Sequence, residues 1–136
     1  MVVSIFLATC RTHNIIGFLE NLKQTADDLS SFEVLIKLDE GATELIHLVS
    51  EYAKTSAYKI KYILSAKLDG YYTLNVGYNE LLTLADPVSY FCWLLTDEIR
   101  LETQGWDWRY SNILHDEYRL SLIASQFLIA DIKYLH

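Results

Sequence analysis

Proline and glycine are scarce in this sequence. One proline and five glycines are spread over 136 residues, and neither an internal repeat nor a low-complexity segment is present. The chain therefore lacks any stretch with the composition of a flexible linker. Its length suits one domain of ordinary size with one proper core. We expect a single domain that spans residues 1–136.

Cysteine is almost absent. Cys10 and Cys92 have neither Cys-x-x-Cys spacing nor a nearby pair of histidines, so the sequence does not indicate a zinc site. Both lie in or beside apolar, strand-like runs, and we expect free, buried thiols of a reducing compartment. The N-terminus lacks the basic region of a signal peptide, and no apolar run approaches the roughly 20 residues of a membrane span. These absences predict a soluble, cytoplasmic protein without a transmembrane segment.

Basic residues are outnumbered by acidic ones. The chain has 11 lysines and arginines against 18 aspartates and glutamates, which gives a net charge of -7. Binding to a phosphate backbone requires clustered lysine and arginine, so the composition argues against a nucleic-acid partner. A local basic pocket for one phosphate group remains compatible with this balance.

Apolar residues make up 51% of the chain, and they follow an ordered pattern. Short apolar runs predict four strands, at Val2–Thr9, Phe32–Glu40, Tyr58–Ser65 and Ser89–Leu95. Between them, apolar residues recur at helical spacing and predict three helices. The three stripes are Ile15, Phe18, Leu19, Leu22 and Ala26; Leu45, Leu48, Val49, Tyr52 and Ala53; and Leu74, Tyr78, Leu81 and Ala85. Asn14 and Thr73 stand where N-caps of the first and third helices are expected.

Alternation of strands and helices predicts an α/β fold with a mostly parallel, doubly wound sheet flanked by helices. Ligands of such sheets bind beyond the carboxyl ends of the strands. Polar residues follow every predicted strand, and we expect them to meet at one edge of the sheet. They are Thr9, Cys10 and Arg11; Asp39 and Glu40; Ser65 and Lys67; and Thr96, Asp97 and Glu98. Periodicity does not assign the last quarter of the chain.

Several nucleotide-binding families are excluded by missing motifs. The turn after the first strand reads "ATCRTHN", without the glycines of a dinucleotide-binding fingerprint. No phosphate-binding loop of the type Gly-x-x-x-x-Gly-Lys-Ser/Thr occurs, and the first strand does not end in the acidic pair of a receiver domain. A flavodoxin-like domain is a remaining alternative, although the same turn lacks a phosphate-cradling run.

Three segments, in order, resemble the GT-A-fold glycosyltransferases of the family-2 type: "VSIFLATCRTHNIIGFLENLKQTADDLSSFEVLIKLDEG", "GYYTLNVGYNELLTLA" and "YFCWLLTDEIRLETQGWD". The resemblance covers about residues 2–107 and implies a GT-A-like nucleotide-binding domain that transfers a sugar from a nucleotide-sugar donor, typically a UDP-sugar, to an acceptor hydroxyl. The sequence departs from the family pattern at Ala8, where proline is usual. Thr96 likewise replaces the first acid of the Asp-x-Asp motif.

The resemblance also implies residue roles. Thr9 and Arg11 would lie beside the base and ribose, Asp39 would accept a hydrogen bond from the base, and Lys67 would face the diphosphate. Asp97 and Glu98 would reach the ribose and a divalent metal, Mn²⁺ or Mg²⁺. Such a cation takes oxygen ligands and neutralises the leaving diphosphate. Asp116 is the candidate catalytic base, because it follows the Gly-Trp segment.

Plainer interpretations stand beside these roles. Asp97 and Glu98 can be a solvated strand end, Asp39 can belong to a turn, and Arg11 can pair with a neighbouring acid. Trp106 and Trp108 either stack on a sugar or cover the end of the sheet. About 30 residues follow Trp106, fewer than in family members. The chain is therefore a minimal enzyme, a protein completed by a partner, or a non-catalytic binding or assembly module that covers an exposed edge by homo-oligomerisation.

Overall fold

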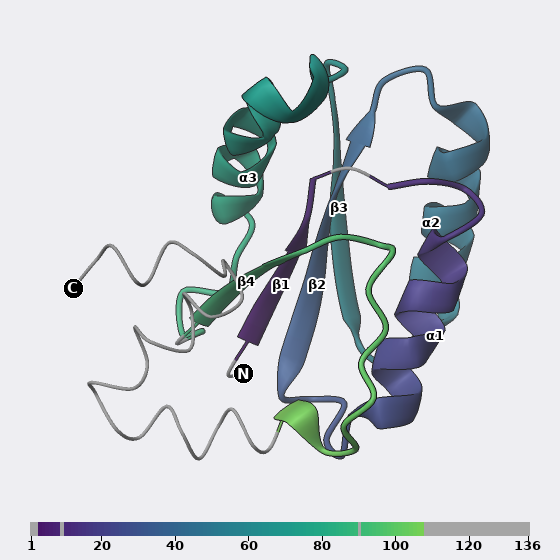
Figure 1. The fold of residues 1–136 in the computed structure, drawn as a ribbon, viewed down its shortest axis with the longest axis vertical. Coiled ribbons are helices and arrows are strands. Elements are labelled where there is room, and N and C mark those ends of the chain that lie inside the picture. Colours follow the sequence, from purple (N-terminus) through teal and green to yellow (C-terminus); the bar gives the residue numbers. More distant parts are fainter. Residues whose placement is uncertain (1–2, 9, 90, 108–136) are drawn as a thin grey trace.

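The structure, a computed structural model, describes residues 3–8, 10–89 and 91–107. Four parallel strands form one sheet in the order β3-β2-β1-β4 (Figure 1). These strands are β1 (Val3–Leu7), β2 (Phe32–Asp39), β3 (Lys59–Ser65) and β4 (Phe91–Leu95). All four predicted strands are confirmed, each with ends within two residues of the expected position. The parallel sheet follows from the helices that return the chain to the starting edge after each strand.

Helices cover both faces of the sheet (Figure 1). α1 (Ile15–Thr25) and α2 (Thr43–Thr55) lie on one face, while the short 3-10 helix η1 (Gly70–Thr73) leads into α3 (Leu74–Leu82) on the other. The expected α/β class and doubly wound arrangement are confirmed. Within the described ranges, no helix has the length and apolar character that crossing a membrane requires.

The face under α1 and α2 carries the larger core. Alternate residues of the two central strands point to it, because successive side chains of a strand face opposite sides. They pack against the stripe of α1, all of whose members within the helix are buried. The buried set includes Val3, Ile5, Leu7, Ile15, Phe18, Leu19, Leu22, Val34, Ile36 and Leu38. Ala26, the last member of the predicted stripe, lies just after the helix and is partly buried.

The face under α3 combines a small apolar cluster with buried charges. Phe6, Leu35 and Leu81 form the cluster. Glu33 is fully buried on β2 and accepts hydrogen bonds from the Ser4 hydroxyl (2.8 Å) and the Asp86 backbone N–H (2.7 Å). Its other carboxylate oxygen lies 3.1 Å from Lys61 Nζ. This network joins the connection between α3 and β4 to the sheet.

The amino ends of the strands are closed by Trp106. Its ring is buried, 5.0 Å from Phe32 and 5.8 Å from Trp93 between ring centroids. Since Phe32 begins β2, this contact lies at the end of the sheet opposite the predicted ligand site. The proposed sugar contact of Trp106 is therefore wrong, and the alternative, a residue that covers a sheet end, is confirmed. Trp108 lies outside the described residues.

Two further expectations need correction. Asn14 and Thr73 occupy the predicted N-cap positions, but neither side chain makes a capping hydrogen bond. Thr73 Oγ1 instead accepts the backbone N–H of Asp69, at 2.7 Å. Both cysteines are free, as expected, but they are not buried: Cys10 is partly exposed, and Cys92, on the edge strand β4, is exposed.

Candidate functional site

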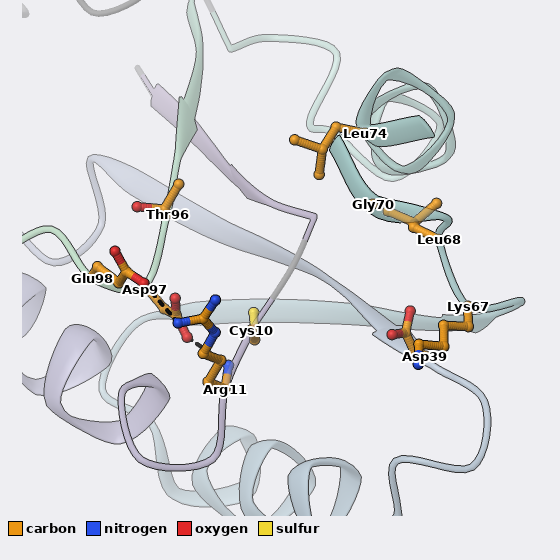
Figure 2. A pocket seen from close by; sticks show the side chains of 10 residues that line it. All are labelled: Cys10, Arg11, Asp39, Lys67, Leu68, Gly70, Leu74, Thr96, Asp97 and Glu98. Carbon is orange, nitrogen blue, oxygen red and sulfur yellow. Dashed lines mark hydrogen bonds and ion pairs between the residues drawn. The ribbon is translucent and has the colours of Figure 1, made fainter. Parts of the chain in front are cut away.

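Residues that follow all four strands line one cavity at the carboxyl edge of the sheet. The cavity has a volume of about 390 Å³. Its lining comes from the ends of β1, β2 and β4 and from the connection between β3 and α3 (Figure 2). The lining residues are Cys10, Arg11, Asp39, Lys67, Leu68, Gly70, Leu74, Thr96, Asp97 and Glu98. The predicted convergence of these strand ends is confirmed.

The cavity lies where the direction of chain winding reverses. From β1 the chain moves outward through β2 to β3, and then returns to the other side of β1 as β4. The loops after β1 and β4 lead to the face that carries α1, whereas the connection after β3 leads to α3 on the opposite face, and the cavity lies between them. Open α/β sheets bind ligands at this position. The topology thus supplies a reason for a binding site here that is independent of any motif.

One side of the cavity is built by the loops after β1 and β4. The backbone N–H of Arg11 donates to Asp97 Oδ2 at 2.6 Å, and the Arg11 guanidinium donates to Glu98 Oε1 at 3.0 Å. Asp97 is buried, whereas the side chains of Arg11 and Glu98 are each 60% exposed. Arg100 Nη1 also donates to the Asp97 carbonyl, at 2.8 Å. The buried carboxylate joins the two loops, and the exposed pair faces solvent at the mouth.

The other side carries Asp39 and Lys67, across the cavity from Arg11 and Glu98 in Figure 2. Asp39 is the last residue of β2, and its side chain is one-third exposed. The Lys37 ammonium, two residues earlier on the same face of the strand, donates to Asp39 Oδ1. The apolar side chains of Leu68 and Leu74 complete the wall towards α3. The site therefore has a polar floor and one apolar wall.

Cys10 lies between the two sides of the cavity (Figure 2). Burial raises the pKa of its thiol well above the usual range, and the carboxylates of Asp97 and Asp39 raise it further. The thiol therefore stays protonated at neutral pH and is a poor nucleophile.

A divalent cation is compatible with part of this lining. Among the described residues, no group of three or more histidine, cysteine, aspartate or glutamate side chains is arranged to hold a metal ion. Asp97 and Glu98 offer hard oxygen atoms at one strand end, and Mg²⁺ sites in phosphate-binding proteins often use one or two carboxylates together with substrate phosphates. Asp39 lies on the far side of the cavity and would not join them. The donor set thus fits a cation completed by a bound phosphate.

Five of the predicted site residues come together. Arg11, Asp39, Lys67, Asp97 and Glu98 all line the cavity. The pairing of Arg11 with a neighbouring acid, the plainer alternative, is confirmed by its contact with Glu98. The predicted roles of Thr9 and Asp116 fall outside the described residues.

Lys37, which was not among the predicted site residues, also contributes to the site through its contact with Asp39. A lysine within an apolar strand is unusual, and the period of two residues places Lys37 on the same face as Asp39. That alternation was the available signal. The apolar wall was also missed, since nothing in a local pattern indicates that Leu68 and Leu74 face the strand ends.

Comparison with known proteins adds no relative to this description. No family model matches the chain, and no match is found among curated proteins or among solved structures. The likeness to GT-A glycosyltransferases therefore depends on the sequence segments quoted above. Any functional conclusion has to be argued from the cavity itself.

Proposed function

We propose that the cavity binds the nucleoside diphosphate part of a nucleotide-sugar donor, together with a divalent cation, and that the protein is a glycosyltransferase of GT-A-like fold. The observation that carries the proposal is the convergence of residues following all four parallel strands on one cavity at the topological switch point. Nucleotides are common ligands of this position. The quoted sequence segments supply the choice of a nucleotide sugar.

The charges of the lining support a role for a cation. Two basic side chains, Arg11 and Lys67, stand against three carboxylates, those of Asp39, Asp97 and Glu98. Lys37 offsets the charge of Asp39, and Arg11 that of Glu98, so the lining offers a diphosphate little net positive charge unless a cation binds with it. When bound, Mn²⁺ or Mg²⁺ would neutralise the diphosphate as it leaves. Glu98 and the second oxygen of Asp97 are its candidate protein ligands, and Arg11 would pair with a phosphate oxygen.

The two sides of the cavity suggest how a donor lies. The base would be at Asp39, which can accept a hydrogen bond from a ring N–H group. The diphosphate would extend towards Arg11 and Glu98, on the side of the cavity opposite Lys67. In this orientation Arg11 takes the diphosphate contact that the resemblance assigns to Lys67, and it does not lie beside the base. In the transfer step, the acceptor oxygen forms a bond to the anomeric carbon as the bond to the diphosphate oxygen breaks, and the electron pair leaves with the diphosphate. The acceptor proton passes to a general base, for which Asp116 is the candidate.

A non-catalytic nucleotide-sugar-binding module is the second candidate. The observation that favours it is that Arg11 already contacts both carboxylates after β4, through its backbone and its side chain. Carboxylates held in this way can serve to shape a binding site without a metal. This candidate predicts nucleotide binding that is independent of divalent cations and no transfer of sugar.

Calorimetric titration tests the proposal. The purified protein is titrated with UDP, GDP, CDP and dTDP, each with Mn²⁺ and with a chelator. We expect one nucleotide to bind, and its affinity to fall about tenfold or more with chelator, because the diphosphate then meets the carboxylates without the charge of the cation. Glu98→Ala should cause a similar loss. Glu102→Ala removes an exposed acid outside the cavity and is the matched control.

The outcomes separate the candidates. Absence of binding by all four nucleotides would overturn both. Binding that neither chelator nor Glu98→Ala weakens would overturn the cation-dependent site and favour the non-catalytic module. Hydrolysis of a UDP-sugar, measured as UDP release, would speak against the module.

A further inference from the structure

Lys37 is a buried cation next to Asp39, one of the residues that line the cavity. Its side chain is completely inaccessible to solvent, and its ammonium donates to Asp39 Oδ1 and to the backbone carbonyl of Ala66, the latter at 2.6 Å. Removing an ammonium group from water is costly unless it is paired and hydrogen-bonded. Apolar side chains fill most other buried positions of β2, so an apolar residue would satisfy packing here. The lysine therefore calls for an explanation beyond stability.

The packing of α3 holds Lys37 in place. Gly77 is the buried glycine of α3, and a Cβ atom at this position would lie 3.8 Å from Lys37 Cγ and 3.2 Å from Ala8 Cβ. The absence of a side chain lets the helix approach β1 and β2 closely. The alkyl stem of Lys37 is covered as a result, and its ammonium is directed along the strand towards the carboxyl edge. There it reaches Asp39 and Ala66 together.

This arrangement restricts what Asp39 can do. Oδ1 is occupied by Lys37, and within the described part of the chain no donor contacts Oδ2. The side chain keeps 33% of its surface exposed and lines the cavity. A carboxylate that rotated freely could accept from donors in many directions. Asp39 instead presents one acceptor oxygen in a fixed direction.

We propose that Lys37 is a positioning residue that fixes Asp39 so that the site selects a base with a ring N–H group, such as uracil, over cytosine. This inference rests on the proposed function, in which Asp39 faces the base. A carboxylate oxygen accepts hydrogen bonds and does not donate them. Uracil offers N3–H at this position, whereas the cytosine ring nitrogen carries a lone pair. A fixed oxygen opposite that nitrogen rejects cytosine, while a rotating carboxylate can turn to its exocyclic amino group.

Lys37→Met tests the proposal, because methionine keeps an unbranched chain of similar length without the charge. Wild-type protein and variants are titrated with UDP and CDP in the presence of Mn²⁺. We expect wild type to prefer UDP by about tenfold or more, as a charge-assisted hydrogen bond allows. In Lys37→Met the preference should fall to about twofold or less, mainly through weaker UDP binding. Lys59→Met removes an exposed lysine of β3 outside the cavity and controls for net charge.

A double-mutant cycle distinguishes positioning from a general structural effect. If Lys37 acts through Asp39, Lys37→Met should change UDP affinity in the wild-type background and not in the Asp39→Asn background. Circular dichroism and urea unfolding establish that each variant is folded. Lys37→Leu, which has no donor and no charge, replaces Lys37→Met in the cycle if the methionine variant does not fold.

The results have separate meanings. If wild type binds neither UDP nor any other nucleoside diphosphate, the proposed function is overturned and the base selection with it. If wild type binds UDP and the folded Lys37 variants keep the same ratio of UDP to CDP affinity, the role of Lys37 is overturned while the nucleotide site stands. Equal effects of Lys37→Met with and without Asp39→Asn would also overturn it.

Discussion

Adjacent side chains at the end of β4 differ in what surrounds them. Asp97 is 4% exposed and accepts a backbone hydrogen bond from Arg11, whereas the Glu98 side chain is 60% exposed and shares a surface ion pair. A hydrogen bond to a buried charged group contributes about 1.5–3 kcal/mol, and an exposed ion pair about 1 kcal/mol or less. The two carboxylates therefore serve different purposes. Asp97 joins two loops through one of its oxygens, and Glu98 lies exposed at the mouth of the cavity.

Asp97→Ala should lower the free energy of unfolding by about 1.5–3 kcal/mol, because the Arg11 N–H loses its acceptor. Glu98→Ala should lower it by about 1 kcal/mol or less. Urea unfolding followed by tryptophan fluorescence measures both. Equal losses in the two variants would contradict the structural role assigned to Asp97.

At the scale of elements, the contact of α3 with the sheet depends on a small residue. A Cβ atom on Gly77 would lie 3.1 Å from Leu68 Cδ1 and 3.2 Å from Ala8 Cβ, tighter than ordinary contacts. Leu68 and Leu74 also line the cavity. The distance at which α3 packs on the sheet therefore determines where the apolar wall of the cavity lies. A change at Gly77 thus affects packing and the site together.

Gly77→Val should destabilise the protein by about 1–3 kcal/mol, the usual effect of adding volume to a packed interface. It should also weaken nucleotide binding, because the wall of the cavity has to move. Asn79→Val places the same side chain at an exposed position of α3 and controls for helix propensity. Thermal unfolding and calorimetric titration measure the two effects. Equal behaviour of the two valine variants would refute this account of α3 packing.

One contact between α1 and α2 is made by Tyr52, whose pKa is raised in the folded protein. The Tyr52 hydroxyl donates to Glu20 Oε1 at 2.8 Å, and burial, followed by this hydrogen bond, raises the pKa of Tyr52 to about 12. The unfolded chain has the ordinary value of 10.0. The folded state thus favours the neutral phenol. Its contribution to stability is complete below about pH 10 and is lost as the pH rises through about 12.

The Tyr52→Phe variant should therefore lose less unfolding free energy at alkaline pH than wild type does. We expect the difference in unfolding free energy between wild type and Tyr52→Phe to be constant below about pH 9 and to shrink from about pH 10 upwards. Urea unfolding over this range measures it. Tyr62→Phe, at an exposed tyrosine of β3, is the control. A constant difference across the whole range would exclude this linkage.

At the scale of the whole molecule, the two ends of the sheet differ: side chains close the amino end, and a cavity lies at the carboxyl end. The amino end is sealed by Trp106 and by Asp107, whose carboxylate accepts the backbone N–H groups of Asp27 and Asp28, each at 2.9 Å. The carboxyl end holds the cavity with its mixed charges. Since the molecule as a whole is acidic, an anion would be repelled wherever no cation or local basic group offsets that charge.

This charge distribution predicts no binding to nucleic acid. A labelled DNA duplex should show no change in fluorescence anisotropy with the protein at physiological salt, because the net charge of -7 repels a phosphate backbone. Metal-dependent binding of a nucleoside diphosphate by the same preparation is the positive control. Salt-sensitive binding of the duplex would contradict the prediction.

Local patterns in the sequence determined the element order and the class of fold. Short continuous apolar runs and apolar residues at helical spacing depend only on neighbouring positions. The strands from Val3–Leu7 to Phe91–Leu95 and the buried stripe of α1 could therefore be identified. The rule for parallel sheets then placed Arg11, Asp39, Lys67, Asp97 and Glu98 at one edge.

Only the tertiary structure decided which of these groups are free to bind a ligand. The acceptor of the Arg11 N–H is 86 residues away along the chain, and the ring that covers Phe32 belongs to Trp106. Neither partnership leaves a local signal, because each depends on how separate elements pack. The same holds for Lys37, whose burial requires the close approach of α3 at Gly77. Periodicity specifies which faces are apolar, and packing specifies which polar groups meet.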